Sequence, residues 1–187
     1  MRRLRLALAA VLLAAPALAQ DGPGPNLVIE VDGQTQGRIV IDMLSDVAPG
    51  HVAQITGLAR DGIYDGVVFH RVIEGFMAQT GDVQYGRLGA DTSMAGMGGS
   101  DRPDLPAEFS DVPYERGIVG MARTQDPDSA NSQFFIMFAP APFLNGEYTV
   151  VGRVIEGMDV VDAIRKGEGR NGEVRDPDWM ARVTVEE

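Results

Sequence analysis

The stretch FHRVIEGFMAQTGD, which runs from Phe69 to Asp82, decides both the fold and the chemistry expected of this chain. It places Arg71 beside a cluster of large apolar side chains, and the neutral amide of Gln79 follows close behind. The stretch contains no nucleophile backed by a base, no pair of catalytic carboxylates and no cluster of metal ligands. These residue types suit a reaction in which no covalent bond is made to the protein and no proton has to move.

Alternating apolar and polar residues indicate short β-strands along the whole chain. Strands are expected at Leu27–Val31, Arg38–Leu44, Val67–Ile73, Met77–Thr80, Gly117–Met121, Gln133–Phe138, Tyr148–Val154 and Arg182–Val185. Apolar residues at helical spacing predict helices at Asp46–Arg60 and Met158–Lys166, the first followed by Gly62 and the second capped by Gly167. The glycine-rich segment Tyr85–Pro106 lacks periodicity and is expected to be a long loop. Together these elements predict a mainly β protein, a closed eight-stranded antiparallel barrel capped by two α-helices.

Strand alternation also sorts the side chains of two of these strands. Because successive side chains point to opposite faces, Met77 and Gln79 share one face while Ala78 lies on the other. By the same rule Gln133 and Phe135 share a face. Each strand then presents one amide and one large apolar group on one side and leaves its other side to fill a core. The alternative is that both faces are simply buried.

The first nineteen residues carry the features of a secretory signal peptide. Three arginines form a basic start, an apolar run covers Leu6–Ala15, and Ala17-Leu18-Ala19 is a small-x-small cleavage signal. The apolar run is shorter than the ~20 residues that a membrane span needs. We therefore divide the chain into a signal peptide at 1–19, a flexible N-terminus at 20–26 and a single domain at 27–187.

Composition narrows the classes of function further. The formal net charge is −11, and it becomes −14 when the three arginines leave with the signal peptide. So acidic a surface argues against nucleic acid or an anionic membrane as a partner. The chain has no cysteine, which excludes disulfides and thiol chemistry. The export signal predicts a periplasmic location in a bacterium, with secretion from the cell as the alternative.

The sequence resembles the cyclophilin family of peptidyl-prolyl cis-trans isomerases from about Leu27 to Val185. The resemblance is carried by the blocks FHRVIEGFMAQTGD (69–82), GIVGMART (117–124), NSQFFIMF (131–138) and FLNGEYTVVGRVIEGMDVVDAI (143–164). Several long blocks in the right order are more specific than one short motif. The resemblance implies an eight-stranded barrel with two helices and a substrate groove on its outer surface. It implies a monomer without cofactor or metal that accelerates rotation about X–Pro bonds in unfolded or flexible exported polypeptides.

The resemblance also implies roles for individual residues. Arg71 corresponds to the catalytic arginine of the family. Gln79 and Gln133 match polar residues of the groove, and Ala122 and Arg123 match the segment whose backbone lies along the bound peptide. The residues that correspond to the pocket for the proline ring are Phe76, Met77, Phe135 and Leu144.

Some groove positions depart from the pattern of eukaryotic members. Phe143 stands where many of them have tryptophan, and Tyr148 stands where histidine is frequent; both are expected to contact the substrate. Thr80 replaces a usual glycine and Arg123 an asparagine. Because the indole that meets cyclosporin is missing, the resemblance implies weak cyclosporin binding. The glycine-rich segment Tyr85–Pro106 is longer than in eukaryotic members and is expected to affect the selectivity of the groove.

Two other functions remain open at this stage. The same groove would serve a peptide-binding or chaperone module with little turnover. A hydrolase using Ser129 or Ser132 with His70 is not excluded by residue order, although no nucleophile-elbow motif is present. His70 is otherwise expected to be a hydrogen-bonded structural histidine, and His51 to be solvated. Two histidines so placed make a poor metal site.

Overall fold

The computed structural model describes residues 21–187, so the predicted signal peptide lies outside the described residues. The strands are β1 (Asn26–Asp32), β2 (Gly37–Met43), β3 (Val67–Val68), β4 (Arg71–Ile73), β5 (Met77–Thr80), β6 (Ile118–Met121), β7 (Phe134–Met137), β8 (Val150–Glu156) and β9 (Trp179–Glu186). The helices are α1 (Pro49–Arg60) and α2 (Met158–Ala163), together with a short 3-10 helix, η1 (Pro142–Leu144). Each predicted strand is present, although several ends are shifted and the last strand is longer than predicted.

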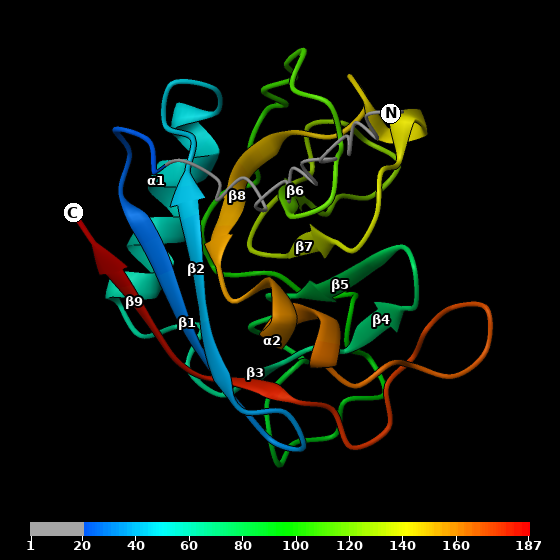
Figure 1. Ribbon diagram of the computed structural model, residues 1–187. Coiled ribbons are helices and arrows are strands. Elements are labelled where there is room, and N and C mark those ends of the chain that lie inside the picture. The colour runs from blue at the N-terminus through cyan, green and yellow to red at the C-terminus, as the bar shows by residue number, and fades with distance from the viewer. Residues whose placement is uncertain (1–20) are drawn as a thin grey trace, which may run out of the picture.

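All of these strands form one antiparallel sheet in the order β3-β9-β1-β2-β8-β6-β7-β5-β4. Figure 1 shows that the sheet is strongly curled rather than flat. Its two edge strands, β3 and β4, follow one another in the chain but do not pair with each other. The expectation of a closed eight-stranded barrel is therefore wrong. The described sheet has nine strands and is open along the seam between β3 and β4.

The seam is open because the predicted strand Val67–Ile73 is interrupted at Phe69 and His70. The backbone groups of these two residues bond to a distant segment instead of a neighbouring strand. The N–H of Phe69 donates to the carbonyl of Asp178, and the N–H of Val174 donates to the carbonyl of His70. Before the interruption β3 pairs with β9, and after it β4 pairs with β5. A covalent link between the two edges thus replaces a hydrogen-bonded ladder.

The two faces of the sheet bury separate sets of apolar side chains, as the alternation predicts. Ala78 of β5 and Phe134 of β7 belong to a large interior cluster, to which both helices also contribute. Met77 and Phe135, their neighbours in sequence, belong to a smaller cluster on the opposite face. Each strand therefore stabilises the interior with one face and leaves the other face to build a site on the outside.

Helix α1 begins at Pro49, whose fixed φ suits the first helical position. The residue before it supplies no capping side chain. Instead, the carboxylate of Glu108 accepts hydrogen bonds from the backbone N–H groups of Gly50 and His51. The same carboxylate lies 2.6 Å from Nδ1 of His51, which is fully buried. The expectation of a solvated His51 is wrong because its partner comes from a remote part of the sequence.

Helix α2 ends at Ala163, before the predicted end at Lys166. Ile164 leaves the helical conformation with φ −50° and ψ 133°, and its side chain is buried in the interior cluster. Gly167 therefore does not cap the helix. Its N–H donates to the carbonyl of Val72, so the segment after α2 lies against the edge strand β4.

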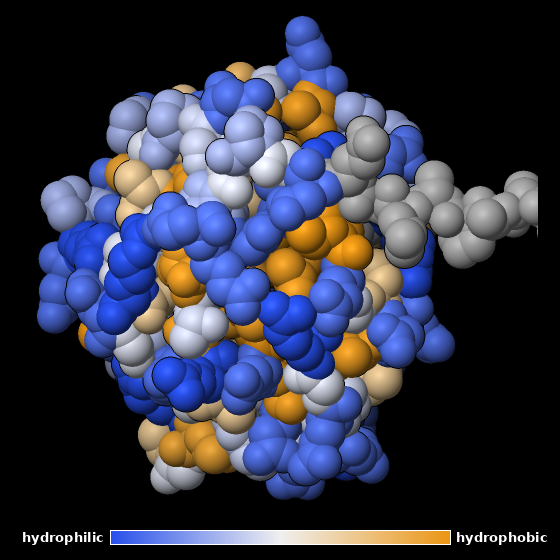
Figure 2. Space-filling view, turned by 60° about the vertical axis from the view of Figure 1, so that its left-hand side comes forward, coloured by the Kyte–Doolittle hydropathy of each residue, from blue (hydrophilic) through white to orange (hydrophobic). Residues whose placement is uncertain are grey.

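Hydrophilic residues cover most of the face seen in Figure 2, and hydrophobic residues are visible in the gaps between them. The large apolar side chains that are exposed on the described chain are Leu88, Met94, Met97, Phe109 and Phe143. Within residues 21–187, no helix has the length and apolar character needed to span a membrane.

Candidate active site

A row of residues crosses four neighbouring strands on the outer face of the sheet. Arg71 of β4 pairs with Gln79 of β5. Gln79 pairs in turn with Phe135 of β7, which pairs with Gly120 of β6. Residues directly opposite one another on antiparallel strands share a face and have Cβ atoms about 5 Å apart. The register of the sheet therefore brings a cation, an amide and an aromatic ring into one line.

An open groove with a volume of about 600 Å³ lies over this row. Buried side chains of Met77, Phe135 and Leu144 form an apolar floor. The rings of Phe76 and Phe143 pair beside it with centroids 5.8 Å apart, and Phe143 is 71% exposed. A concave apolar floor with a few polar groups at its margin is typical of a ligand-binding site.

The floor of the groove depends on the absence of a side chain at Gly120. A Cβ atom there would lie 2.3 Å from Oη of Tyr114 and 2.7 Å from Cζ of Phe135. Without it, the rings of Tyr114 and Phe135 stack with centroids 5.8 Å apart. Phe135 also meets Tyr148 edge to face at 5.9 Å. Phe135 is thus held from two sides, in the arrangements that aromatic pairs prefer.

The guanidinium of Arg71 is held by the protein at two of its three nitrogens. Its Nε donates to the carbonyl of Asn171 at 3.0 Å, and its Nη1 donates to Oε1 of Gln79 at 3.1 Å. Its Nη2 makes no hydrogen bond within residues 21–187. Partial burial lowers the pKa of Arg71, but a guanidinium remains protonated in proteins. Arg71 is therefore an oriented cation at the groove, with donor capacity to spare.

The two predicted amides form a pair next to Arg71. Nε2 of Gln79 donates to Oε1 of Gln133 at 2.9 Å, and Nε2 of Gln133 donates to the carbonyl of Gly98 at 2.7 Å. Gln133 does not line the groove over Phe135. It lines a second depression of about 310 Å³, which shares Gln79, Ala122 and Arg123 with the first.

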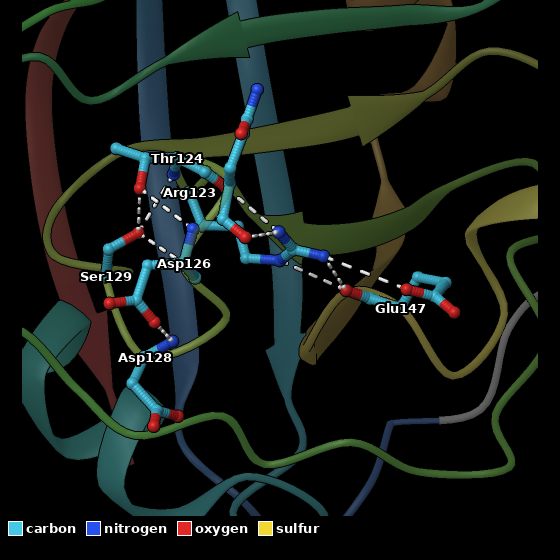
Figure 3. Close-up of polar contacts among 7 residues, drawn as sticks. Arg123, Thr124, Asp126, Asp128, Ser129 and Glu147 are labelled. Atoms are coloured by element: carbon cyan, nitrogen blue, oxygen red, sulfur yellow. Dashed lines mark hydrogen bonds and ion pairs between the residues drawn. The ribbon is translucent and has the colours of Figure 1, made fainter.

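Arg123 and Glu147 both line the groove, and Figure 3 shows Arg123 reaching across to Glu147, so that it connects two walls of the groove. Its Nε and Nη2 donate to the carbonyl of Glu147 at 3.1 and 2.7 Å, and its Nη1 donates to the carbonyl of Thr124 at 2.9 Å. The guanidinium also lies over the ring of Tyr148, with Cζ 4.4 Å from the ring centroid. Because most of its donors already serve the protein, Arg123 shapes the groove rather than offering a free charge to a ligand.

The structure brings the predicted site residues together. All of them except Gln133 line one groove, and Gln133 lines the depression beside it. Their individual roles remain predictions. Sequence reasoning missed Glu147, Gly120 and Asn171. The position of Glu147 beside Tyr148 is a signal that would have found it, but no local pattern indicates that the carbonyl of Asn171 meets Arg71.

The Ser-His-Asp alternative does not fit the geometry. The hydroxyls of Ser129 and Ser132 donate to backbone carbonyls at 2.7 Å, and neither bonds to His70 in the described chain. His70 is buried, and neither of its ring nitrogens makes a hydrogen bond of normal geometry, contrary to expectation. Burial lowers the pKa of His70 to about 4, although the nearby carboxylate of Asp82 acts in the opposite direction. Within residues 21–187, no three acidic or histidine side chains are grouped as metal ligands.

The curled antiparallel sheet thus carries an apolar groove and an oriented cation on its outer face, and the described residues that line this groove include no serine, threonine or cysteine nucleophile. The family model described as cyclophilin type peptidyl-prolyl cis-trans isomerase matches residues 27–185. A probable peptidyl-prolyl cis-trans isomerase of Brucella suis is 60% identical over 153 residues, which are 80% of this chain and 78% of that protein. Peptidyl-prolyl cis-trans isomerase B of Escherichia coli is 39% identical over 145 residues, 73% of this chain and 84% of that protein.

A solved structure gives the same result. The cyclophilin AquaCyp293 from Hirschia baltica matches with a TM-score of 0.71 and 27% identity, over 88% of this chain and 74% of that one. The chain therefore belongs to the family of cyclophilin-type peptidyl-prolyl cis-trans isomerases, and its curled nine-stranded sheet is the cyclophilin fold. It is an enzyme of the EC 5.2.1.8 class, which accelerates the cis–trans isomerisation of X–Pro peptide bonds.

The clamp made by Arg123 leads to a first prediction. Arg123→Ala removes the link between the two walls without touching Arg71, so we expect KM to rise about three- to tenfold while kcat stays within about twofold. Arg123→Lys is expected to behave like Arg123→Ala, because an ammonium lacks the planar fork that reaches two walls at once. The measurement is steady-state isomerisation of an X–Pro test peptide.

Arg116→Ala is the matched control, since Arg116 also donates to a backbone carbonyl but does not line the groove. Its KM should be unchanged. A fall in kcat of Arg123→Ala as large as the fall in kcat/KM would contradict a role limited to the shape of the groove.

Proposed function

We propose that this chain is an exported, monomeric isomerase that acts on X–Pro bonds of unfolded or flexible proteins in the periplasm. In this proposal Arg71 is the catalytic residue, and its guanidinium donates a hydrogen bond to the prolyl nitrogen in the twisted transition state. Export is supported by the basic, apolar and small-residue pattern of residues 1–19. No cofactor enters the reaction.

The energetic argument begins with the peptide bond. Rotation about it must break amide resonance, and the barrier is about 18–20 kcal/mol. In the planar ground state the prolyl nitrogen cannot accept a hydrogen bond, because its lone pair is delocalised. In the twisted state the lone pair returns to the nitrogen. A donor aimed at that nitrogen therefore binds the transition state more strongly than the substrate, which is the condition for catalysis.

The observation that carries the proposal is the half-held guanidinium of Arg71. Asn171 and Gln79 fix its direction, while its Nη2 keeps a donor without a partner in the described chain. The apolar floor beside it includes Met77 and Phe135, which suit a proline ring. With the ring fixed there and the preceding residues held by Gln79 and the backbone of Ala122, only the bond between them is free to turn.

A second candidate function is a peptide-binding or chaperone module that uses the same groove with little turnover. It is favoured by the openness of the groove to solvent and by the exposed Phe143 and Met97, which offer apolar surface to an unfolded chain. A binding module needs the floor of the groove but not a donor to the prolyl nitrogen. Arg71 therefore separates the two functions.

The test of the main proposal is Arg71→Ala. We expect kcat to fall about 10²- to 10³-fold, as is common when one preorganised donor to a transition state is lost, while affinity for a proline-containing peptide changes about threefold or less. A protease-coupled assay measures kcat, and calorimetric titration measures affinity. Arg182→Ala, which removes an exposed arginine from β9, is the control and should change neither. Wild-type turnover in Arg71→Ala would leave the binding module as the better description.

The pH dependence provides an independent prediction. Arg71 stays protonated and His70, with its pKa lowered to about 4 by burial, stays neutral, so kcat should be nearly flat between about pH 6 and 9. A bell-shaped profile in this range would indicate general acid–base catalysis.

The stability of the protein, unlike kcat, should depend on pH. The unfolded chain takes up a proton at His70 from about pH 6.5, whereas the folded chain does so only near pH 4. The free energy of unfolding should therefore decrease as the pH is lowered from about 6.5 to about 4.

Cyclosporin binding tests the ligand-contacting role of Phe143. We expect weak binding by the wild-type protein and a gain of about tenfold or more in Phe143→Trp, because an indole adds apolar area and an N–H donor. Phe109→Trp, at an exposed phenylalanine outside the groove lining, is the control. Titration calorimetry on the three proteins decides the point, and equal affinities would remove Phe143 from the predicted contact set.

A further inference from the structure

Asp82 carries a fully buried carboxylate whose hydrogen bonds, within residues 21–187, all come from backbone N–H groups. Its Oδ1 accepts hydrogen bonds from Gln84 and Tyr85 at 3.1 and 2.8 Å. Its Oδ2 accepts hydrogen bonds from Gly96 and Gly98 at 2.7 and 2.9 Å. A buried charge is tolerated only when such partners surround it. Asp82 thus holds both the start of the glycine-rich loop and the part of the loop that lines the depression beside the groove.

The loop is packed too closely around Asp82 to move independently of it. A Cβ atom at Gly98 would lie 2.5 Å from Oδ1 of Asp82 and 2.7 Å from Cβ of Gln84. Gly96 has a positive φ of 99°, and a Cβ there would come within 3.4 Å of Nε2 of His70. The N–H of Gly98 is therefore held against Asp82, and the carbonyl of the same residue accepts a hydrogen bond from Nε2 of Gln133.

From Gly98 a continuous series of hydrogen bonds leads to Arg71. The carbonyl of Gly98 accepts from Gln133, Oε1 of Gln133 accepts from Gln79, and Oε1 of Gln79 accepts from Nη1 of Arg71, with distances of 2.7, 2.9 and 3.1 Å. Each amide in the series has a donor end and an acceptor end. The orientation of one therefore dictates the orientation of the next.

We propose that Asp82 is a positioning residue for Arg71, acting through Gly98, Gln133 and Gln79. With the Gly98 carbonyl in place, Gln133 must turn its oxygen to Gln79, and Gln79 must turn its oxygen to the guanidinium. If the carbonyl moves away, either amide is free to rotate. The NH₂ group of Gln79 could then face Nη1 of Arg71, and two donors would repel each other where a hydrogen bond had been. Arg71 would then pivot about its remaining bond to Asn171. The inference rests on the proposed catalytic role of Arg71.

The test uses Asp82→Asn in the mature protein. An amide has one acceptor end, so it satisfies one pair of backbone donors and opposes the other with its NH₂ group. We expect kcat to fall about tenfold, because a displacement of about 1 Å at a catalytic group is enough to cost on the order of 10²-fold, while KM changes little. In the Arg71→Ala background, Asp82→Asn should lower kcat by less than about twofold, since the two changes act through one group.

Asp178→Asn is the matched control for loss of a buried carboxylate. Asp178 is also fully buried and accepts hydrogen bonds from the N–H groups of Gln34, Thr35 and Arg165, but no bond connects it to Arg71 in the described chain. Both variants should lower the melting temperature, and only Asp82→Asn should lower kcat. Gln133→Met, which cuts the series while leaving Asp82 and the loop intact, should reproduce the fall in kcat even if Asp82→Asn folds poorly.

A signal that does not depend on turnover separates this inference from the proposed function. The Nε–H resonance of Arg71 in a ¹⁵N NMR spectrum, assigned by its loss in Arg71→Lys, should shift in Asp82→Asn and Gln133→Met but not in Asp178→Asn. An unchanged resonance, or equal losses of kcat with and without Arg71, would overturn the positioning role. Wild-type turnover in Arg71→Ala would instead refute the proposed function, and the resonance would still decide whether Asp82 orients Arg71.

Discussion

The alternation of side chains along β5 and β7 is the constraint on which the rest of the structure depends. One face of these strands, with Ala78 and Phe134, fills the interior cluster, and the other face, with Met77 and Phe135, forms the floor of the groove. A register slip of one residue would exchange the two sets, putting the groove residues inside and the core residues in solvent. The same alternation therefore specifies the interior and the groove. The register that buries the core residues also determines which side chains form the floor of the groove.

The chemistry of the groove follows from what lies at the margin of this floor. The groove offers an oriented guanidinium, an apolar surface and the amide of Gln79, which are the groups that the proposed mechanism requires. Segments far from the strand row hold these groups in place. Asn171 follows α2, Gly98 lies in the glycine-rich loop, and Glu147 precedes β8. The register of the sheet places the groove side chains next to one another, and hydrogen bonds from the loops orient their polar groups.

Much of the fold and the composition of the groove was predictable from the sequence. Alternation and the resemblance to cyclophilins depend on local patterns, so they identified the strands, the two faces and Arg71 with its neighbours. The predictions failed where distant segments decide the outcome. The strand at Val67–Ile73 is interrupted because Asp178 and Val174 take the backbone bonds of Phe69 and His70.

Two further errors have the same origin. His51 is buried because Glu108 reaches the start of α1 from a remote loop. Helix α2 is short because Ile164 leaves the helical conformation and packs into the interior cluster. The same limit applies to the site, since no local pattern could indicate that Asp82, through Gly98, leads to the guanidinium of Arg71.

The central claim is that Arg71 donates to the prolyl nitrogen only when the peptide bond is twisted. The most direct test is to measure the acceleration, kcat relative to the uncatalysed rate, for peptides whose proline ring carries increasingly electron-withdrawing substituents. If the claim holds, the acceleration by the wild-type enzyme falls as the nitrogen becomes a poorer acceptor, and the much smaller acceleration by Arg71→Ala does not change across the series. An acceleration by the wild-type enzyme that is independent of the substituent would contradict it.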